Sequence, residues 1–371
     1  MKKYVKKMKV LYLHISQNLG GVEKRFATLY LHLLADPDRN TTVIMSRSFI
    51  SKLPFSPKIK GCNRLIKYGF VHKKSGRFSR YLDYLSLVFI LLLIFQKKYD
   101  VAHFPTSGSR LFFSYVRAGK KVVSEVTSYR KWLERDLHSP QFQRAIKRGA
   151  YVDCLDSNIA EAVRSAYSGH KRQVFAAPCS FADYAGTECV FSKKERAICF
   201  CGRLIEIKGT DILLEILEDL LNRTSWKIYI LGNGDQKHRF VDYLEKHKVH
   251  DRMIVGYTSN PKEYLKKTML FLSLQSDENY PSQSLLEAMA CSNIPLATNV
   301  GLTGQLVRKD FGFLVSDASD LLRVLISLEN ESLDVLEQMG LQARKFVIQR
   351  HNVQLYSKYL FESVYKGYQS V

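Results

Sequence analysis

The sequence lacks several features that would place it in a special class of protein. Its seven cysteines show no paired C-x-x-C spacing, and their odd number indicates reduced thiols rather than a disulfide framework or a zinc site. The lysines among the first nine residues are followed by an apolar run of only six residues, 10–15, which is too short for a signal peptide. We therefore expect a cytoplasmic protein without a metal site.

One strongly apolar stretch, residues 81–95 (YLDYLSLVFILLLIF), is shorter than the ~20 residues that a membrane-spanning helix needs. One interpretation is a helix that packs against the core of the protein. The other is a helix that lies in the interface of an anionic membrane, because basic residues flank the stretch. These are Lys73, Lys74, Arg77, Arg80, Lys97 and Lys98.

Acidic residues are scarce in the first half of the chain. Residues 1–185 carry 33 Lys and Arg against 12 Asp and Glu, a net charge of +21, whereas residues 186–371 carry 23 against 23, a net charge of zero. An excess confined to one half indicates an acidic partner for that half. A phosphate-bearing substrate, an anionic membrane surface and nucleic acid all satisfy this condition.

Apolar runs with the length of buried strands alternate with helical patterns along the whole chain. Such strands are expected at 8–15, 42–45, 101–103 and 121–126, and again from 197–201 onward. This alternation predicts an α/β protein with doubly wound parallel sheets. A polar linker near 180–194 divides the chain into a domain over 1–185 and a domain over 190–352.

Two segments of the second half have the character of an anion site. Arg203 and Lys208 bracket a short turn after a strand, so both side chains can converge on one anion, although an isolated pair would be read as two solvated charges. Residues 276–301 begin with a turn-prone loop that leads into the N-terminus of a short helix, 285–290, where backbone N–H groups favour an anion. Ser282 and Ser284 can cap this helix, and Glu287 requires a hydrogen-bonding partner such as a ribose diol.

These segments resemble the donor-site motifs of family-4-type retaining glycosyltransferases, the glycosyl transferases group 1. The matching pieces are GRLxxxKG at 202–209, LLEAMA at 285–290 with the strand that follows, and a GGxE turn at 20–23. The likeness is specific across 197–315, and across 1–185 it rests on topology and one turn. It implies the GT-B fold, in which two Rossmann-like domains face a cleft and a last helix, about 353–371, returns to the first domain.

The resemblance also implies roles for individual residues in binding a nucleotide sugar. Its diphosphate would lie against the Gly20 and Gly21 amides and the clamp of Gly202, Arg203, Lys208 and Gly209. Its base would lie near Tyr257, and Ser282, Gln283, Ser284 and Glu287 would complete the donor site. A GG turn alone would indicate only a turn with positive φ.

Two positions depart from the pattern of the family. The family spaces its two glutamates eight residues apart, but Glu278 and Glu287 are nine apart, so either Glu278 or Asn279 orients the sugar. Where family members often carry a histidine near the reacting sugar, this chain has Thr127, with Glu125 as the nearest carboxylate. We expect His14 and His103, which follow or end strands, to be structural.

We therefore expect a hexosyltransferase-type enzyme that moves a sugar, with retention, to a cell-surface polysaccharide precursor of the lipopolysaccharide or capsule type, or to a lipid-linked acceptor. Arg203 and Lys208 would stabilise the leaving diphosphate in place of a metal, and no other cofactor or nucleic acid is expected. A nucleotide-sugar epimerase and a non-enzymatic binding module are weaker alternatives. The stronger alternative is a catalytically lapsed homologue that binds a nucleotide sugar or a membrane, given the shifted glutamate and the missing histidine.

Overall fold

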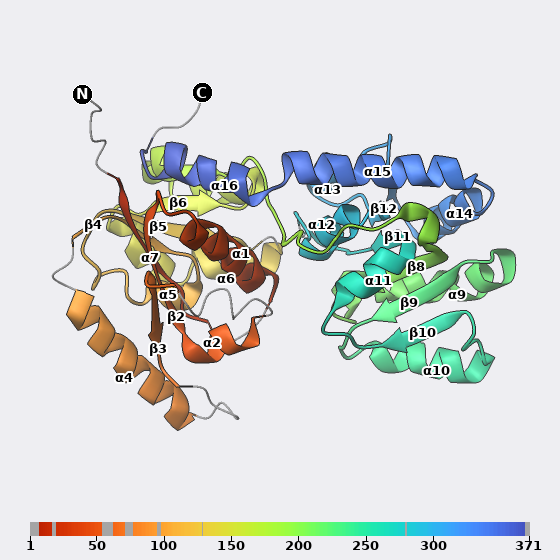
Figure 1. The fold of residues 1–371 in the computed structure, drawn as a ribbon, viewed down its shortest axis with the longest axis horizontal. Coiled ribbons are helices and arrows are strands. Elements are labelled where there is room, and N and C mark those ends of the chain that lie inside the picture. Colours follow the sequence, from red (N-terminus) through yellow and green to blue (C-terminus); the bar gives the residue numbers. More distant parts are fainter. Residues whose placement is uncertain are drawn as a thin grey trace. The chain divides into compact units, whose positions relative to one another are not determined.

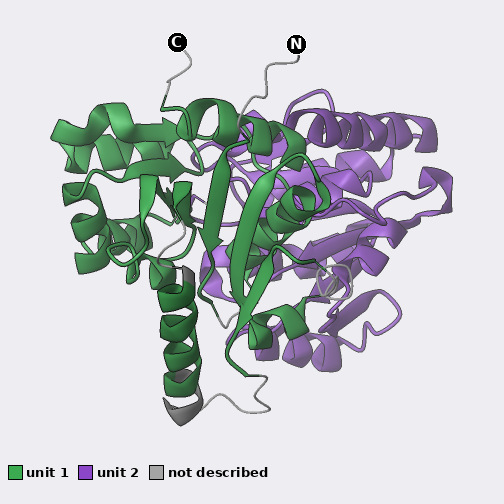
Figure 2. Cartoon of the chain, turned by 60° about the vertical axis from the view of Figure 1, so that its left-hand side comes forward, with its two compact units in different colours: residues 1–181, 353–371 green, residues 182–352 purple. Residues whose placement is uncertain are grey.

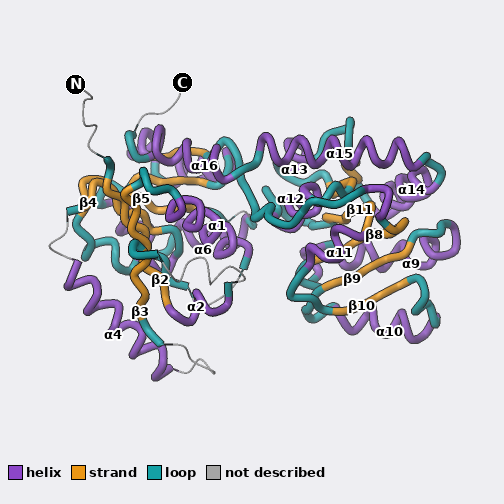
Figure 3. The backbone as a smooth tube through the Cα atoms, viewed as in Figure 1, coloured by secondary structure: helices purple, strands orange, loops and turns teal. Residues whose placement is uncertain are grey.

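The computed structural model describes residues 7–16, 20–53, 62–70, 77–94, 98–127, 129–278 and 280–367. The chain forms two units, one of Met1–Phe181 with Val353–Val371 (unit 1) and one of Ala182–Asn352 (unit 2) (Figure 2). Strands and helices alternate along both, which confirms the predicted α/β class (Figure 3). Of the residues discussed above, Lys73, Lys74, Phe95, Lys97 and Asn279 lie outside the described ranges.

Unit 1 contains a seven-stranded parallel sheet in the order β3-β2-β1-β4-β5-β6-β7 (Figure 1). Its strands are β1 Lys9–Leu13, β2 Asn40–Ser46, β3 Leu65–Tyr68, β4 Tyr99–Phe104, β5 Ala118–Glu125, β6 Tyr151–Cys154 and β7 Val174–Ala176. Its helices before the linker are α1 Gly21–Ala35, α2 Arg47–Lys52, α4 Arg77–Ile94, α5 Ser107–Arg110, α6 Arg130–Leu137, α7 Pro140–Lys147 and α8 Ser157–Ala166. Strand β1 is apolar from Val10 to Leu13, and these residues are fully buried because both faces of the sheet are covered.

Unit 2 contains a six-stranded parallel sheet in the order β10-β9-β8-β11-β12-β13. Its strands are β8 Glu195–Cys201, β9 Lys227–Leu231, β10 Met253–Gly256, β11 Thr268–Ser273, β12 Ile294–Thr298 and β13 Phe313–Val315. Its helices are α9 Thr210–Arg223, α10 Lys237–His247, α11 Pro261–Lys267, α12 Gln283–Ala290, α13 Thr303–Leu306, α14 Ala318–Glu329 and α15 Leu333–Arg350. The order of the strands reverses between β8 and β11, the kind of position where open α/β sheets bind ligands.

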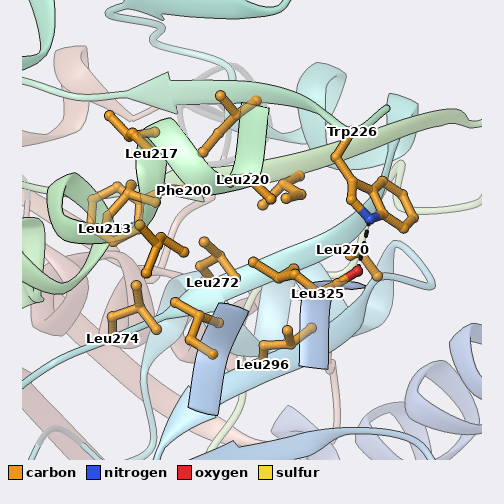
Figure 4. Packing of buried hydrophobic residues seen from close by; sticks show 14 of the residues in the cluster. Phe200, Leu213, Leu217, Leu220, Trp226, Leu270, Leu272, Leu274, Leu296 and Leu325 are labelled. Atoms are coloured by element: carbon orange, nitrogen blue, oxygen red, sulfur yellow. Dashed lines mark hydrogen bonds between the residues drawn. The ribbon is translucent and has the colours of Figure 1, made fainter. Parts of the chain in front are cut away.

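One of the two core layers of unit 2 lies between the sheet and helices α9 and α14. Leucines of α9 and α14 interdigitate with Phe200 of β8 and with the leucines of β11 and β12 (Figure 4). Trp226 is fully buried at the end of this layer, and its Nε1–H donates to the Leu325 carbonyl at 3.1 Å. This close-packed layer therefore supports β8 and β11, the two strands between which the strand order reverses.

The C-terminal segment, α16 Val353–Tyr359 and a π-helical turn at Leu360–Val364, belongs to unit 1. A buried chain of hydrogen bonds fixes it there. Tyr356 donates to Asp153 Oδ2 at 2.6 Å, and Ser124 donates to the same oxygen at 2.9 Å. Because its hydroxyl proton is thus engaged, Ser124 accepts from His103 Nε2 at 2.6 Å, and His103 Nδ1 accepts from Tyr365 at 2.7 Å. His103 is therefore neutral.

Candidate functional site

The turn that carries Arg203 and Lys208 is held in place by its backbone. It follows β8, and Gly202 and Leu204 donate their amides to the Leu231 and Asn233 carbonyls, each at 3.0 Å. The turn ends at Gly209, whose φ of +79° opens helix α9. A Cβ at Gly209 would lie 1.8 Å from the Leu274 carbonyl oxygen, so only glycine lets the turn approach the end of β11.

Gly232 and Gly234, which follow β9, allow the backbone after β9 to pack closely against the turn of Arg203 and Lys208. A Cβ at Gly232 would lie 1.8 Å from the Gly202 carbonyl oxygen, and one at Gly234 would lie 2.1 Å from the Leu204 carbonyl oxygen. These residues seat the turn of Arg203 and Lys208 against the neighbouring strand. The glycines of the loop after β9 thus act as a support for the candidate clamp.

Lys208 is directed by a residue that the sequence reasoning did not single out. Its Nζ donates to Gln275 Oε1 at 3.1 Å, and Gln275 is itself buried, with Nε2 donating to Ser273 Oγ at 3.3 Å. Burial, and secondly the nearby Arg203, lower the pKa of Lys208 to about 8. Arg203 is thus close enough to act on the same ammonium group, which supports their convergence on one anion. The one sequence feature that could have indicated Gln275 is its position just after a strand, at the carboxyl edge of the sheet.

The loop after β11 is joined to this turn. Ser276 donates its amide to the Ile207 carbonyl at 3.1 Å. Glu278 Oε1 accepts from the Leu302 amide at 3.0 Å, and a Cβ at Gly301 would lie 2.5 Å from that oxygen. The Glu278 carboxylate therefore packs on the turn after β12. Whether Glu278 or Asn279 takes the place of the first of the two glutamates of the family stays a prediction, because Asn279 is outside the described ranges.

The predicted capping of helix α12 by serine side chains is wrong. Helix α12 has Ser282 as its N-cap residue, but the Ser282 side chain makes no cap hydrogen bond. Its hydroxyl pairs instead with the Ser284 hydroxyl at 3.1 Å. Gln283 is the first residue of α12, and Glu287 is half-buried among fully or nearly fully buried neighbours on the same helix.

The strand register brings these residues to one edge of unit 2. Cys201 pairs with Leu231, and Leu231 pairs with Gly256, so the turns after β8, β9 and β10 leave the sheet together. Tyr257, directly after β10, is 65% exposed and offers an open aromatic ring at this edge. The edge therefore joins two cations, an aromatic ring and a loop leading to a helix N-terminus.

The GGxE turn lies at the equivalent edge of unit 1, after β1. Gly20 is the N-cap of α1 with φ of −103°, so a need for positive φ does not explain it. Its amide donates to Glu23 Oε2 at 3.0 Å, and Ser16 donates to Glu23 Oε1 at 2.9 Å. Gly21 is the first residue of the helix. Glu23 therefore caps its own helix, and a donor contact of Gly20 and Gly21 stays a prediction.

The carboxylate nearest the usual histidine position is already engaged. Glu125 is buried and forms an ion pair with Arg110 at 2.9 Å, and it accepts the Val126 and Thr127 amides, each at 3.1 Å. Thr127 donates its hydroxyl to Asp136 at 3.2 Å. Glu125 is thus unsuited to act as a base.

The two histidines of unit 1 have the properties of structural residues. His14 is fully buried, with Nδ1 3.1 Å from the Tyr30 hydroxyl, and burial lowers its pKa to about 3. Burial likewise lowers the pKa of His103 to about 3. Both are neutral at physiological pH.

Within the described part of the chain, no group of three or more His, Cys, Asp or Glu residues is placed to hold a metal ion. In the same residues, every helix is too short or too polar to cross a bilayer.

The fold is that of the GT-B glycosyltransferases. HepE from Anabaena, solved in complex with UDP, has a TM-score of 0.71 at 16% identity, over 96% of this chain and 99% of that one. Sucrose-phosphate synthase from Thermosynechococcus elongatus gives a TM-score of 0.66 at 16% identity, over 98% of this chain and 100% of that one. At such identities the likeness shows the fold alone.

Residues 188–346 match the model for glycosyl transferases group 1, which confirms the predicted resemblance over that part of the chain. The capsular polysaccharide biosynthesis glycosyltransferase CapH of Staphylococcus aureus is 28% identical over 115 residues, 30% of this chain and 32% of that protein. The N-acetyl-alpha-D-glucosaminyl L-malate synthase of Bacillus anthracis is 22% identical over 184 residues, 48% of this chain and 46% of that protein. The chain thus aligns with less than half the length of these curated relatives.

Proposed function

We propose that this protein is a retaining glycosyltransferase that uses a nucleoside-diphosphate sugar. The observation that carries the proposal is the position of Lys208 and Arg203 at the reversal point of the unit 2 sheet, where Gln275 holds the lysine and Ser276 links the following loop. Two adjacent cations, one of them half-buried, suit a diphosphate, because an anion relieves both their repulsion and the cost of burial.

The chemistry follows from where negative charge develops. Cleavage of the bond between sugar and phosphate leaves a nucleoside diphosphate, and Arg203 and Lys208 are placed to stabilise it as it departs. Preorganised donors of this kind contribute ~3 kcal/mol each to the transition state. Glu278 or Asn279 would orient the sugar hydroxyls, and Glu287 would bind the ribose. In this account the cations perform the task that a divalent metal performs in other transferases, so transfer needs no metal or other cofactor.

A uridine nucleotide is the first donor to consider, because HepE was solved with UDP and with UDP-glucose. Tyr257, exposed beside the site, offers a place for the base. The acceptor follows from the charge of the other unit, since a basic surface suits a phosphate-bearing or lipid-linked glycan precursor. CapH, named for capsular polysaccharide biosynthesis, supports a cell-surface polysaccharide as the product. The enzyme would then work in the cytoplasm, at the inner face of the membrane.

The test is a donor panel. Purified protein is incubated with UDP-, GDP- and ADP-linked sugars in EDTA, and both released nucleoside diphosphate and thermal shift are recorded. We expect release with one donor, and severe loss of release in Lys208→Gln but not in Lys246→Gln, which removes an exposed lysine of the same unit from α10. No release and no thermal shift with any donor would contradict the proposal.

A second candidate is a catalytically lapsed transferase that still binds a nucleotide sugar. It is favoured by the Glu125–Arg110 ion pair and by Thr127, which leave the usual histidine position without an evident catalytic group. A thermal shift without release of nucleoside diphosphate, in the same panel, would support this candidate over the active enzyme.

A further inference from the structure

The outer side of helix α4 presents a continuous apolar surface. Seven side chains on this side are between 41% and 66% exposed. We call them the α4 face: Tyr81, Tyr84, Leu85, Val88, Phe89, Leu92 and Leu93. They follow helical spacing, and the only charged residue from 81 to 94 is Asp83, which is buried on the other side. A soluble helix normally carries charges on its exposed half, so this surface requires an explanation.

The exposure does not result from a loosely attached helix. The inner side of α4 places Leu87 and Leu91 in the core against the sheet. Asp83 Oδ1 accepts the Phe70 amide at 2.9 Å, and Ser86 Oγ accepts the Gly69 amide at 2.7 Å, which ties the helix to the end of β3. In Figure 1, α4 stands away from the other helices of unit 1. The helix is thus fixed with its apolar half directed outward.

A second segment extends this surface. The Tyr84 ring stacks with Phe112, with ring centroids 6.4 Å apart, and Phe112 contacts Tyr115 at the same centroid distance. Tyr115 is 65% exposed and Leu111 is 42% exposed. The turn at 111–115 therefore adds aromatic and aliphatic side chains beside the helix.

Basic residues border the same surface. Lys121 Nζ donates to the Phe113 carbonyl at 2.8 Å, and Arg148 donates to the Ser114 hydroxyl, so two cations flank the turn. Residues 1–185, with 33 basic against 12 acidic residues, carry a net charge of +21. Two copies of such a surface would repel each other, whereas an anionic bilayer satisfies both the apolar residues and the cations.

We propose that the α4 face docks on the surface of an anionic lipid bilayer. The helix would lie in the interface, with Leu85, Phe89 and Leu92 in the acyl boundary and the tyrosines at the level of the headgroups. This surface belongs to unit 1 and does not depend on the donor chemistry of unit 2. Its failure can therefore be separated from failure of the proposed transferase activity.

Vesicle co-sedimentation of the full chain tests the proposal. The probes are vesicles of phosphatidylcholine alone and of phosphatidylcholine mixed with phosphatidylglycerol. The variant Phe89→Asp/Leu92→Asp changes two side chains that are 63% and 66% exposed, so folding is retained, which thermal melting verifies. The control is Val335→Asp/Leu341→Asp, which changes two exposed apolar residues of helix α15 in unit 2.

We expect the wild type and the control to bind the anionic vesicles, with binding weakened by salt, and the α4 variant to bind at least roughly tenfold less. Equal binding by the α4 variant, or no binding of the wild type to either vesicle, would overturn the proposal. Light scattering that shows a wild-type dimer and a monomeric α4 variant, without vesicle binding, would assign the face to a second copy of the chain. A UDP-induced thermal shift retained in the α4 variant would show that the donor site is intact.

Discussion

At the residue scale, the close approach of Gly209 to the end of β11 sets the geometry of the candidate site. The sequence motif pointed to Gly202, Arg203, Lys208 and Gly209 together, but it did not distinguish their roles. The structure separates them: the glycine permits the turn, and the two cations occupy it. Gln275 was missed because no local pattern shows that a buried glutamine will meet a lysine 67 residues away.

Gly209→Ala should destabilise unit 2 more than Gly186→Ala does. Both glycines have positive φ, +79° and +71°, but a Cβ at Gly186 meets no atom within 4 Å, whereas one at Gly209 collides with backbone. We expect about 1 to 2 kcal/mol of strain for Gly186→Ala and a larger loss for Gly209→Ala. Urea unfolding measures both. Equal losses would show that the turn can shift at little cost.

The pKa of Lys208 gives the candidate site a pH dependence. Burial, with Arg203 as the second cause, lowers that pKa to about 8, and a bound diphosphate would raise it again. Affinity for UDP should therefore be highest below pH 8 and fall as the pH rises through that value, because the neutral amine no longer attracts the anion. Calorimetric titration from pH 7 to 9 measures the change. If the affinity for UDP does not change with pH, and Lys208→Gln shows the same pH dependence as the wild type, then Lys208 does not bind the anion.

At the scale of elements, the C-terminal segment is the part whose attachment depends on polar groups. Tyr356, Tyr365, His103, Ser124 and Asp153 form one buried network between this segment and the sheet of unit 1. Burial raises the pKa of Asp153 to about 6 and lowers those of His14 and His103 to about 3. The acid and the two bases therefore affect stability in opposite directions as pH changes.

Stability should fall as the pH drops from 6.5 toward 5. The histidines have folded pKa values below 6.5, so their stabilisation is present above pH 6.5 and is lost on acidification, and His351 of unit 2, lowered to about 4, acts with the same sign. Asp153 has a folded pKa above its ordinary value of 3.8, so it acts in the opposite direction. On acidification the folded state takes up this proton before the unfolded state does, and that uptake increases the free energy of unfolding. The three bases outweigh the one acid, and we expect a net loss of about 3 to 4 kcal/mol in the free energy of unfolding.

The control for this prediction is Asp153→Asn. The amide keeps an oxygen for Tyr356 and Ser124 but removes the compensating proton uptake, so its stability should fall more steeply over the same pH range. Urea unfolding at pH 7 and pH 5 compares the two proteins. A shallower fall in the variant would contradict the assigned pKa directions.

At the scale of the whole molecule, periodicity predicted the two parallel sheets because strands covered on both faces are apolar throughout. The helix over 81–95 shows where periodicity was insufficient. Its apolar content fitted both a core helix and an interfacial helix. In the structure one side of the helix is buried and the other is exposed. The buried side is the one that carries Leu87 and Leu91, and this orientation depends on tertiary packing that the sequence pattern does not show. The serine capping of α12 failed for a similar reason, since Ser282 has a hydroxyl partner in Ser284 that its sequence position did not reveal.

The division of charge also belongs to this scale. Residues 186–371 are neutral overall and yet hold the paired cations of the candidate site, whereas the net +21 lies in residues 1–185. The proposed donor binding in unit 2 therefore rests on the local placement of two cations, whereas the membrane and acceptor proposals for unit 1 rest on long-range charge.

Calorimetric titration of UDP in EDTA, at pH 7, tests the central claim most directly. The claim is that Lys208, positioned by Gln275, binds the diphosphate of a nucleotide sugar. We predict binding to the wild type and to Lys246→Gln, about fivefold weaker binding to Gln275→Ala from the loss of one hydrogen bond of about 1 kcal/mol, and a larger loss in Lys208→Gln. Equal affinity of all four proteins for UDP would contradict the claim, as would the absence of UDP binding by the wild type.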